Sequence, residues 1–111
     1  MSAAYPEPAV TGLAATTPVL DVVIPVHNEE VDLEPSVRRL HAYLDGEFPF
    51  SARITIADNA STDGTLAIAT RLAEELPGVR VEHLPVKGRG RALKQAWGAS
   101  DAVVLAYMDV D

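Results

Sequence analysis

The chain has 111 residues, carries a formal net charge of −7, is 48% hydrophobic and contains no cysteine. This length fits one small domain, and the apolar content excludes wholesale disorder. The acidic balance argues against nucleic acid as a partner of the whole chain, and the missing cysteines exclude disulfide scaffolds, thiol catalysis and cysteine metal sites while fitting a reducing compartment.

The N-terminal segment is rich in Pro, Ala and Thr. Residues 1–18 contain no basic region followed by an apolar core, so we interpret them as a flexible tail rather than a signal peptide. No apolar run approaches the ~18 residues that a membrane span requires. We therefore expect a cytoplasmic protein whose folded domain covers residues 19–111.

From Val19 onward, strand-like and helix-like segments alternate. The β-branched run 19–26 predicts a strand that is buried on both faces, and apolar residues from Leu33 to Leu44 then recur at helical spacing. The cycle repeats, giving expected strands at 52–57, 79–84 and 102–108 and expected helices at 65–76 and 91–99. Such alternation implies right-handed crossovers, so we predict an α/β fold with a Rossmann-like parallel sheet of about four strands and three helices.

Every strand-to-helix connection in such a sheet lies at the carboxyl edge of the strands, where α/β proteins bind ligands. The segments predicted at this edge are 27–30, 58–64, 85–90 and 109–111. The unusual polar and charged chemistry of the chain falls on these segments, whereas the opposite edge receives ordinary turns. A ligand site is therefore predicted at the carboxyl edge.

Asp109 and Asp111 follow the fourth predicted strand. Residues two apart in extended chain point to the same side, so these carboxylates form a pair of hard oxygen ligands suited to Mg²⁺ or Mn²⁺. The alternative is a strand end with two solvated acids, because Asp-x-Asp triplets are common. The position on the ligand edge favours the metal site.

Asp58 directly follows an apolar strand. Its carboxylate can accept hydrogen bonds from a nucleobase or serve as a turn acid. Thr62 and Asp63 are assigned instead to the turn and the helix start, with a buried structural role for Asp63. His41 and His83 lack evident partners in the sequence and receive no role.

Residues 87–94, KGRGRALK, form a basic, glycine-punctuated segment that opens a helix. Glycines permit close backbone approach and helix N–H groups favour phosphate, while the alternative is a solvated cationic helix start. The segment is not a dinucleotide fingerprint, because Leu93 occupies the third glycine position, and it lacks the Gly-Lys-Ser/Thr of a Walker A loop. Trp97 is expected to pack the third helix on the sheet, and no serine has a histidine relay for a hydrolase triad.

The order of four segments resembles a known family. DVVIPVHNEE, IADNASTDGT, KGRGRALKQAWGA and VLAYMDVD together look like the nucleotide-sugar-binding, N-terminal half of a family 2 glycosyltransferase, which implies the GT-A fold. Within that family, GRGRAL and IPVHNEE look most like the polyprenyl-phosphate (dolichyl-phosphate type) mannosyl- and glucosyltransferases. The resemblance covers residues 19–111.

The resemblance implies roles on the base side of the site. Pro25, His27 and Glu29 occupy the first-loop positions that line the base and ribose, with His27 where the family usually has Tyr. Asp58 matches the acid that reads the base. The common pattern Asp-Asp-Gly-Ser is replaced here by the sequence DNAS at 58–61.

It also implies roles on the phosphate side. Arg89 falls where a Lys or Arg near the diphosphate is expected, and Asp109 with Asp111 matches the Asp-x-Asp that holds a divalent cation bridging the sugar-nucleotide diphosphate. The acceptor-binding part follows this motif in the family. We therefore expect residues 19–111 to be a donor-binding domain truncated after the Asp-x-Asp, poor in transfer and prone to self-association through an exposed sheet edge.

The function predicted from the sequence is metal-dependent, inverting transfer of a sugar from a UDP- or GDP-linked donor to a polyprenyl or dolichyl phosphate at the cytoplasmic face of the membrane. A catalytically inactive nucleotide-binding or regulatory remnant is the alternative. A receiver-like signalling domain is disfavoured, because the first strand ends in 25–27 without a pair of acids.

Overall fold

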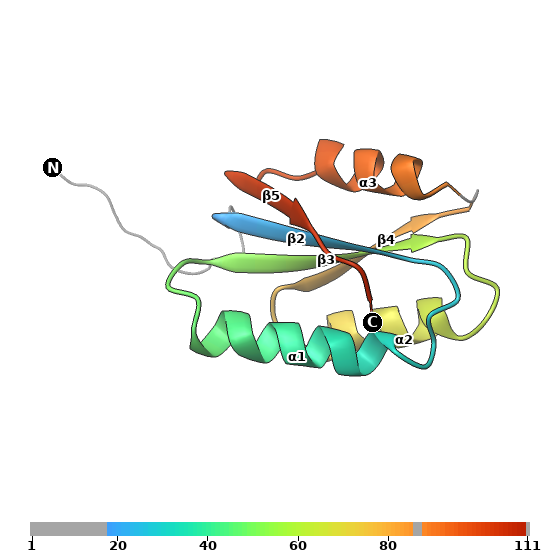
Figure 1. Cartoon of the computed structure of the whole chain (residues 1–111), viewed down its shortest axis with the longest axis horizontal. Helices are drawn as coiled ribbons and strands as arrows, with labels where there is room; N and C mark the ends of the chain where they lie inside the picture. The colour runs from blue at the N-terminus through green and yellow to red at the C-terminus, as the bar shows by residue number, and fades with distance from the viewer. Residues whose placement is uncertain (1–17, 86–87, 111) are drawn as a thin grey trace, which may run out of the picture.

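The computed structural model describes residues 18–85 and 88–110, except for the side chains at 89 and 92. Almost all of the predicted tail, Lys87, the Arg89 side chain and Asp111 lie outside this description. The elements in chain order are β2 (Leu20–Val26), α1 (Leu33–Gly46), β3 (Ala52–Asn59), α2 (Thr65–Glu75), β4 (Val79–Leu84), α3 (Arg89–Gly98) and β5 (Val104–Tyr107) (Figure 1).

The described strands form one parallel sheet of four strands in the order β4-β3-β2-β5. The predicted α/β fold, with strands and helices alternating around a parallel sheet, is confirmed and fits the N-terminal, Rossmann-like part of a GT-A fold. Two boundaries differ from the prediction. β3 continues through Asp58 and Asn59, because these residues stay in register with His83 and Leu84 of β4. β5 is shorter than expected and pairs with β2 as far as Val23↔Tyr107.

Alternate residues of each strand serve two helical layers, as strand geometry requires. Val22, Ile24, Ile54 and Ile56 belong to the main core, together with Leu33 and Val37 of α1 and Ala69 and Leu72 of α2. A smaller core joins Val23, Ala57 and Leu84 to Ala96 of α3, with Leu93 and Trp97 packed against it. Figure 1 shows α3 on one face of the sheet and α1 with α2 on the other. The prediction that Trp97 packs α3 on the sheet is confirmed.

β5 forms an outer strand of the described sheet, and both β5 and the residue before it carry exposed apolar side chains. Val103 is 77% exposed, Val104 49%, Leu105 39% and Tyr107 49%. The backbone on its outer side carries hydrogen-bonding groups that can pair with another strand. None of the helices within the described residues is long and apolar enough to cross a membrane.

A buried polar cluster closes the amino edge of the sheet. Asp21 has no exposed surface; its Oδ1 accepts a hydrogen bond from Thr55 Oγ1 at 2.8 Å, and its Oδ2 accepts from Arg53 Nη2 at 2.9 Å and Ser100 Oγ at 2.7 Å. Arg53 also contacts Asp101 Oδ1 at 2.9 Å. The cluster therefore ties β2 and β3 to the connection between α3 and β5.

Candidate functional site

The carboxyl ends of β2, β3 and β4 meet at one edge of the sheet, as predicted. Val26, Asp58 and His83 are neighbours across the three strands, so the loops that follow them start side by side. Parallel α/β proteins bind ligands at this edge. The side chains of these loops contact one another in a network that runs from the first loop to the third.

Asn28 joins the loop after β2 to the loop after β3. Its backbone N–H donates to Ser61 Oγ at 3.0 Å, and its side-chain oxygen Oδ1 accepts from the backbone N–H groups of Thr62 at 2.8 Å and Asp63 at 3.3 Å. A single amide side chain thus satisfies donors that the tight turn leaves unpaired. The two loops are held as one unit before any ligand binds.

Two residues of this unit adopt left-handed backbone conformations. Asn28 and Ala60 both have φ of 55°. Asn tolerates this region, whereas an alanine there is strained by the contact of its Cβ with the backbone. The glycine of the common Asp-Asp-Gly-Ser pattern is replaced by Ala60, yet the turn keeps a conformation that favours glycine.

The loop after β2 is also tied to the start of α2. Glu29 donates its backbone N–H to Thr65 Oγ1 at 2.8 Å, and Glu30 Oε1 accepts from Gly64 N at 2.8 Å. A Cβ on Gly64 would lie 2.8 Å from that same Glu30 oxygen, so a larger residue there would displace the Glu30 side chain from its hydrogen bond. Asp63 Oδ1 accepts from Thr65 N at 2.9 Å, and hydrogen bonding from Thr65 holds the Asp63 pKa below its usual range.

The structural role predicted for Asp63 is therefore confirmed, but its predicted burial is wrong. Asp63 is exposed to solvent, because its carboxylate turns back to the helix start at the surface rather than into the core.

Asn59 connects the second loop to the first and the third. It is 4% exposed; its backbone carbonyl contacts His27 Nδ1 at 2.7 Å, and its Oδ1 accepts from Gly88 N at 2.7 Å. His27 is thus a hydrogen-bonding residue that links the first loop to the end of β3. Gly88 is the residue that precedes α3, so Asn59 fixes the backbone where this helix begins.

Asp58 and His83 form a pair at the ends of β3 and β4. Asp58 has no exposed surface, and its Oδ2 lies 2.9 Å from His83 Nδ1. A carboxylate can only accept here, so Nδ1 carries the proton. Oδ1 of Asp58 is buried without a hydrogen-bond partner among the described residues. The interpretation that His83 lacks a partner is therefore wrong. His41 also has a partner, since its Nε2 lies 2.9 Å from the Pro77 carbonyl oxygen.

Asp109 follows β5 at the same edge and is exposed. Met108 and Val110 on either side of it pack against the main core. Because alternate residues of extended chain face opposite sides, this places Asp109 on the other side of the segment. The described residues contain no cluster of three or more acids or histidines that can hold a metal, and Asp111 lies outside them.

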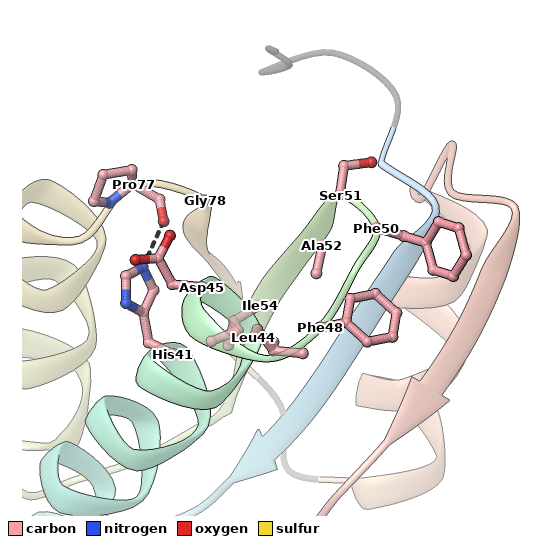
Figure 2. A pocket seen from close by; sticks show the side chains of 10 residues that line it. All are labelled: His41, Leu44, Asp45, Phe48, Phe50, Ser51, Ala52, Ile54, Pro77 and Gly78. Atoms are coloured by element: carbon pink, nitrogen blue, oxygen red, sulfur yellow. Dashed lines mark hydrogen bonds between the residues drawn. The ribbon is translucent and has the colours of Figure 1, made fainter. Parts of the chain in front are cut away.

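A cavity of about 220 Å³ lies at the opposite, amino edge of the sheet, away from these residues. Figure 2 shows its wall, which is built from the end of α1, the start of β3 and the turn before β4, with His41 bonded to Pro77. Phe48 and Phe50 line it in an edge-to-face contact with ring centroids 5.7 Å apart. The wall is lined by both polar and apolar residues, with Asp45 as the acid among them.

Comparison with known proteins shows the family of the chain. Residues 21–111 match the family described as Glycosyl transferase family 2. The chain belongs to this family. Over 75 residues, or 68% of its length, the chain is 40% identical to the succinoglycan biosynthesis protein ExoA of Rhizobium meliloti (strain 1021). The chain covers 22% of that protein, and the comparisons give no specific support for the dolichyl-phosphate subgroup.

The family description names glycosyl transfer, and the role of this chain in such a reaction is a proposal. Of the residues predicted to line the base and ribose, Pro25 is buried within β2, while His27 and Glu29 are half-buried in the loop that follows. Both loop residues are held by contacts with the β3–α2 segment. Their roles toward a nucleotide stay predictions.

The N-terminus of α3 lies at the same edge, where the sequence predicts phosphate binding. Gly88 is its N-cap residue, without a side-chain cap, and exposed Arg91 and Lys94 lie in its first turns. The predicted role of Arg89 depends on a side chain outside the description, as does that of Asp111.

Sequence reasoning missed Asn28, Asn59 and His83. Each acts through contacts with residues about 25 to 35 positions away, which strand pairing brings together. The signal that was available is their common position at the ends of adjacent predicted strands.

Proposed function

We propose that the carboxyl edge binds the nucleoside diphosphate of a UDP- or GDP-linked sugar for transfer to an acceptor. The observation that carries this proposal is Asp58, which is fully buried while its Oδ1 has no partner within the described residues. Buried carboxylate oxygens are normally paired, because leaving one unpaired in a low-dielectric site is unfavourable. The ring N–H of uracil or guanine supplies the missing donor.

The phosphates then fall to α3 and its preceding loop. Uncapped N–H groups at a helix N-terminus attract phosphate oxygens, and Arg91 and Lys94, with the predicted Arg89, add positive charge to this otherwise acidic chain. Asn59 supports this arrangement by fixing the backbone at Gly88. The base site and the phosphate site thereby share one buried connector.

Family 2 members typically use a divalent cation, and we propose that Asp109 and Asp111 hold Mg²⁺ or Mn²⁺. Carboxylates are the ligands such ions prefer, and Asp109 is exposed at the edge where the diphosphate is expected. When bound, the cation neutralises negative charge that develops on the leaving diphosphate. The pair fits this ion by its donor chemistry and by its place after β5.

The reaction proposed is inverting transfer. An acceptor oxygen forms a bond to the anomeric carbon as the bond to the diphosphate breaks, and the nucleoside diphosphate leaves with the electron pair. A phosphate acceptor is already anionic and needs no general base, whereas a hydroxyl acceptor requires one. GRGRAL and IPVHNEE favour a polyprenyl phosphate, while the relative's name points to succinoglycan biosynthesis.

Thermal unfolding with Mn²⁺ and a panel of UDP- and GDP-linked sugars tests donor binding. A donor at about one hundred times its Kd should stabilise the chain by about 2.7 kcal/mol. Asp58→Asn should remove most of this gain, whereas Asp45→Asn, in the cavity at the opposite edge, should retain it. If no donor raises the unfolding temperature, the proposed nucleotide site is refuted.

A nucleotide-binding role without transfer is the second candidate, because the chain covers 22% of its relative. Radiolabelled sugar transfer to polyprenyl phosphate and to saccharide acceptors separates the two. Transfer by this chain that Asp111→Asn abolishes supports the enzyme. Donor binding without any transfer supports the nucleotide-binding role.

A further inference from the structure

Two buried aspartates of this sheet differ in how their carboxylates are satisfied. Asp21, at the amino edge, accepts hydrogen bonds on both oxygens, from Thr55 on Oδ1 and from Arg53 and Ser100 on Oδ2. Asp58, at the carboxyl edge, is equally buried but accepts from His83 on Oδ2, while Oδ1 stays unpaired among the described residues. The first arrangement is that of a structural acid, and the second leaves one acceptor for a ligand.

The position of His83 determines which of the two Asp58 oxygens is left for a ligand. It lies directly opposite Asp58 in the register of β3 and β4, and its Nδ1 contacts Oδ2 at 2.9 Å. A hydrogen bond to one oxygen restrains rotation of the carboxylate about its terminal torsion, which is otherwise broad.

We propose that His83 is a positioning residue for base recognition, holding the Asp58 carboxylate so that Oδ1 accepts the ring N–H of uracil or guanine. The inference rests on the proposed nucleotide site. His83 would thereby contribute to selectivity for bases that present a donor N–H to Asp58. His83 itself would not contact the reacting atoms.

The exposure of His83 separates this role from a packing role. Its side chain is 45% exposed, so it contributes little to the core, and its partner is the buried member of the pair. Removing an exposed imidazole should leave the fold intact while releasing the carboxylate. The expected effect is therefore on recognition of the base rather than on the folded state.

The test uses the full chain with Mn²⁺ and compares nucleotides that keep or lack the ring N–H. UDP is paired with N3-methyl-UDP, and GDP with N1-methyl-GDP, by isothermal titration. His83→Ala should weaken binding of the preferred unmethylated nucleotide by about fivefold to tenfold, the loss expected for one hydrogen bond. It should leave binding of the methylated analogue unchanged, because that analogue cannot make the bond.

His83→Asn is the conservative variant, since its side-chain N–H lies near the position of Nδ1, and it should restore selectivity against methylation. His41→Ala, which removes a histidine bonded to Pro77 at the opposite edge, should bind both nucleotides like the wild type. An equal loss for methylated and unmethylated nucleotides in His83→Ala indicates a structural role and overturns the inference.

Wild-type selectivity that persists unchanged in His83→Ala also overturns the inference, while leaving the proposed nucleotide site standing. A wild-type chain that binds neither UDP nor GDP, or that binds methylated and unmethylated forms equally, refutes the Asp58 base site itself, and the role of His83 with it.

Discussion

Replacing Asp21 with Asn tests how strongly the buried cluster at the amino edge holds the sheet. Asp21→Asn keeps the shape of the side chain but removes its charge and turns one acceptor oxygen into a donor. Arg53 and Ser100 both donate to Oδ2, so a donor at that position leaves them facing an N–H group. Burial lowers the Arg53 pKa, but the hydrogen bonds that Arg53 donates to Asp21 and Asp101 outweigh burial and raise it overall.

The magnitude follows from what remains after the substitution. Removing one partner of a buried ion pair typically destabilises a protein by about 3–5 kcal/mol. Arg53 keeps its contact with Asp101, whose side chain is 54% exposed, so the remaining charge is partly compensated. We therefore expect the low end, about 3 kcal/mol. Domains of this size are stable by about 5–15 kcal/mol, so the variant should fold with a much reduced margin.

Urea unfolding followed by circular dichroism measures this loss. The midpoint should fall with little change in the slope, because the surface exposed on unfolding is the same. Asp45→Asn, which changes an exposed acid, should stay within about 0.5 kcal/mol of the wild type. An Asp21→Asn variant that matches this control would refute the idea that the cluster holds β2, β3 and the α3–β5 connection together.

Three further predictions concern the turn, the helix surface and the sheet edge. Ala60→Gly should raise the free energy of unfolding by about 0.5–1 kcal/mol, because φ is 55° there. Ala67→Gly, at an exposed position of α2, should lower the free energy of unfolding by about 1 kcal/mol. Equal losses in the two variants would contradict the strain at Ala60. Hydrogen bonds from Arg71 and, second in size, from Arg38 lower the Glu34 pKa to about 2, below its ordinary value of 4.5. The stabilisation that these hydrogen bonds give the folded state is therefore present above pH 4.5 and is lost as the pH falls toward about 2. The difference in melting temperature between wild type and Glu34→Gln should therefore shrink on acidification, and a constant difference would contradict the assignment. Self-association through exposed β5 should appear in sedimentation velocity and weaken in Val104→Lys, and a monomeric wild type at high concentration would rule it out.

The fold was predictable because its periodicities are unambiguous. Leu33, Val37 and Leu72 lie on helical faces that reach the main core, and the apolar runs of β2 and β3 are buried on both sides. What the sequence could not give was the end of β3. Asp58 and Asn59 resemble loop residues by type, yet pairing with β4 keeps them in the strand. Tertiary pairing overrides local preference at such positions.

The sequence predicted where the site lies, but it did not predict which of its residues contact one another. Asp58 was expected at the ligand edge because it ends an apolar strand, but its partner His83 is 25 residues away in sequence and depends on strand register. Asn28 likewise gains its role only when the first two loops are adjacent. A hydrogen bond between side chains far apart in the chain requires knowledge of order and register, which periodicity does not contain.

Hydrogen bonds hold the loops around Asp58 at the carboxyl edge, and this bears on how a donor would bind. Asn28 and Asn59 fix the loops around Asp58, so the proposed acceptor for the base would be in place before binding, and little ordering would be needed there. Asp109 instead follows β5, a strand of four residues whose surface is largely exposed. Under the proposed function, binding of the base would then position the diphosphate next to the proposed metal ligands that follow β5. Under the proposed function, only interactions that strengthen in the transition state accelerate transfer, so we expect the loops around Asp58 to serve recognition and the proposed metal ligands Asp109 and Asp111 to bear on rate.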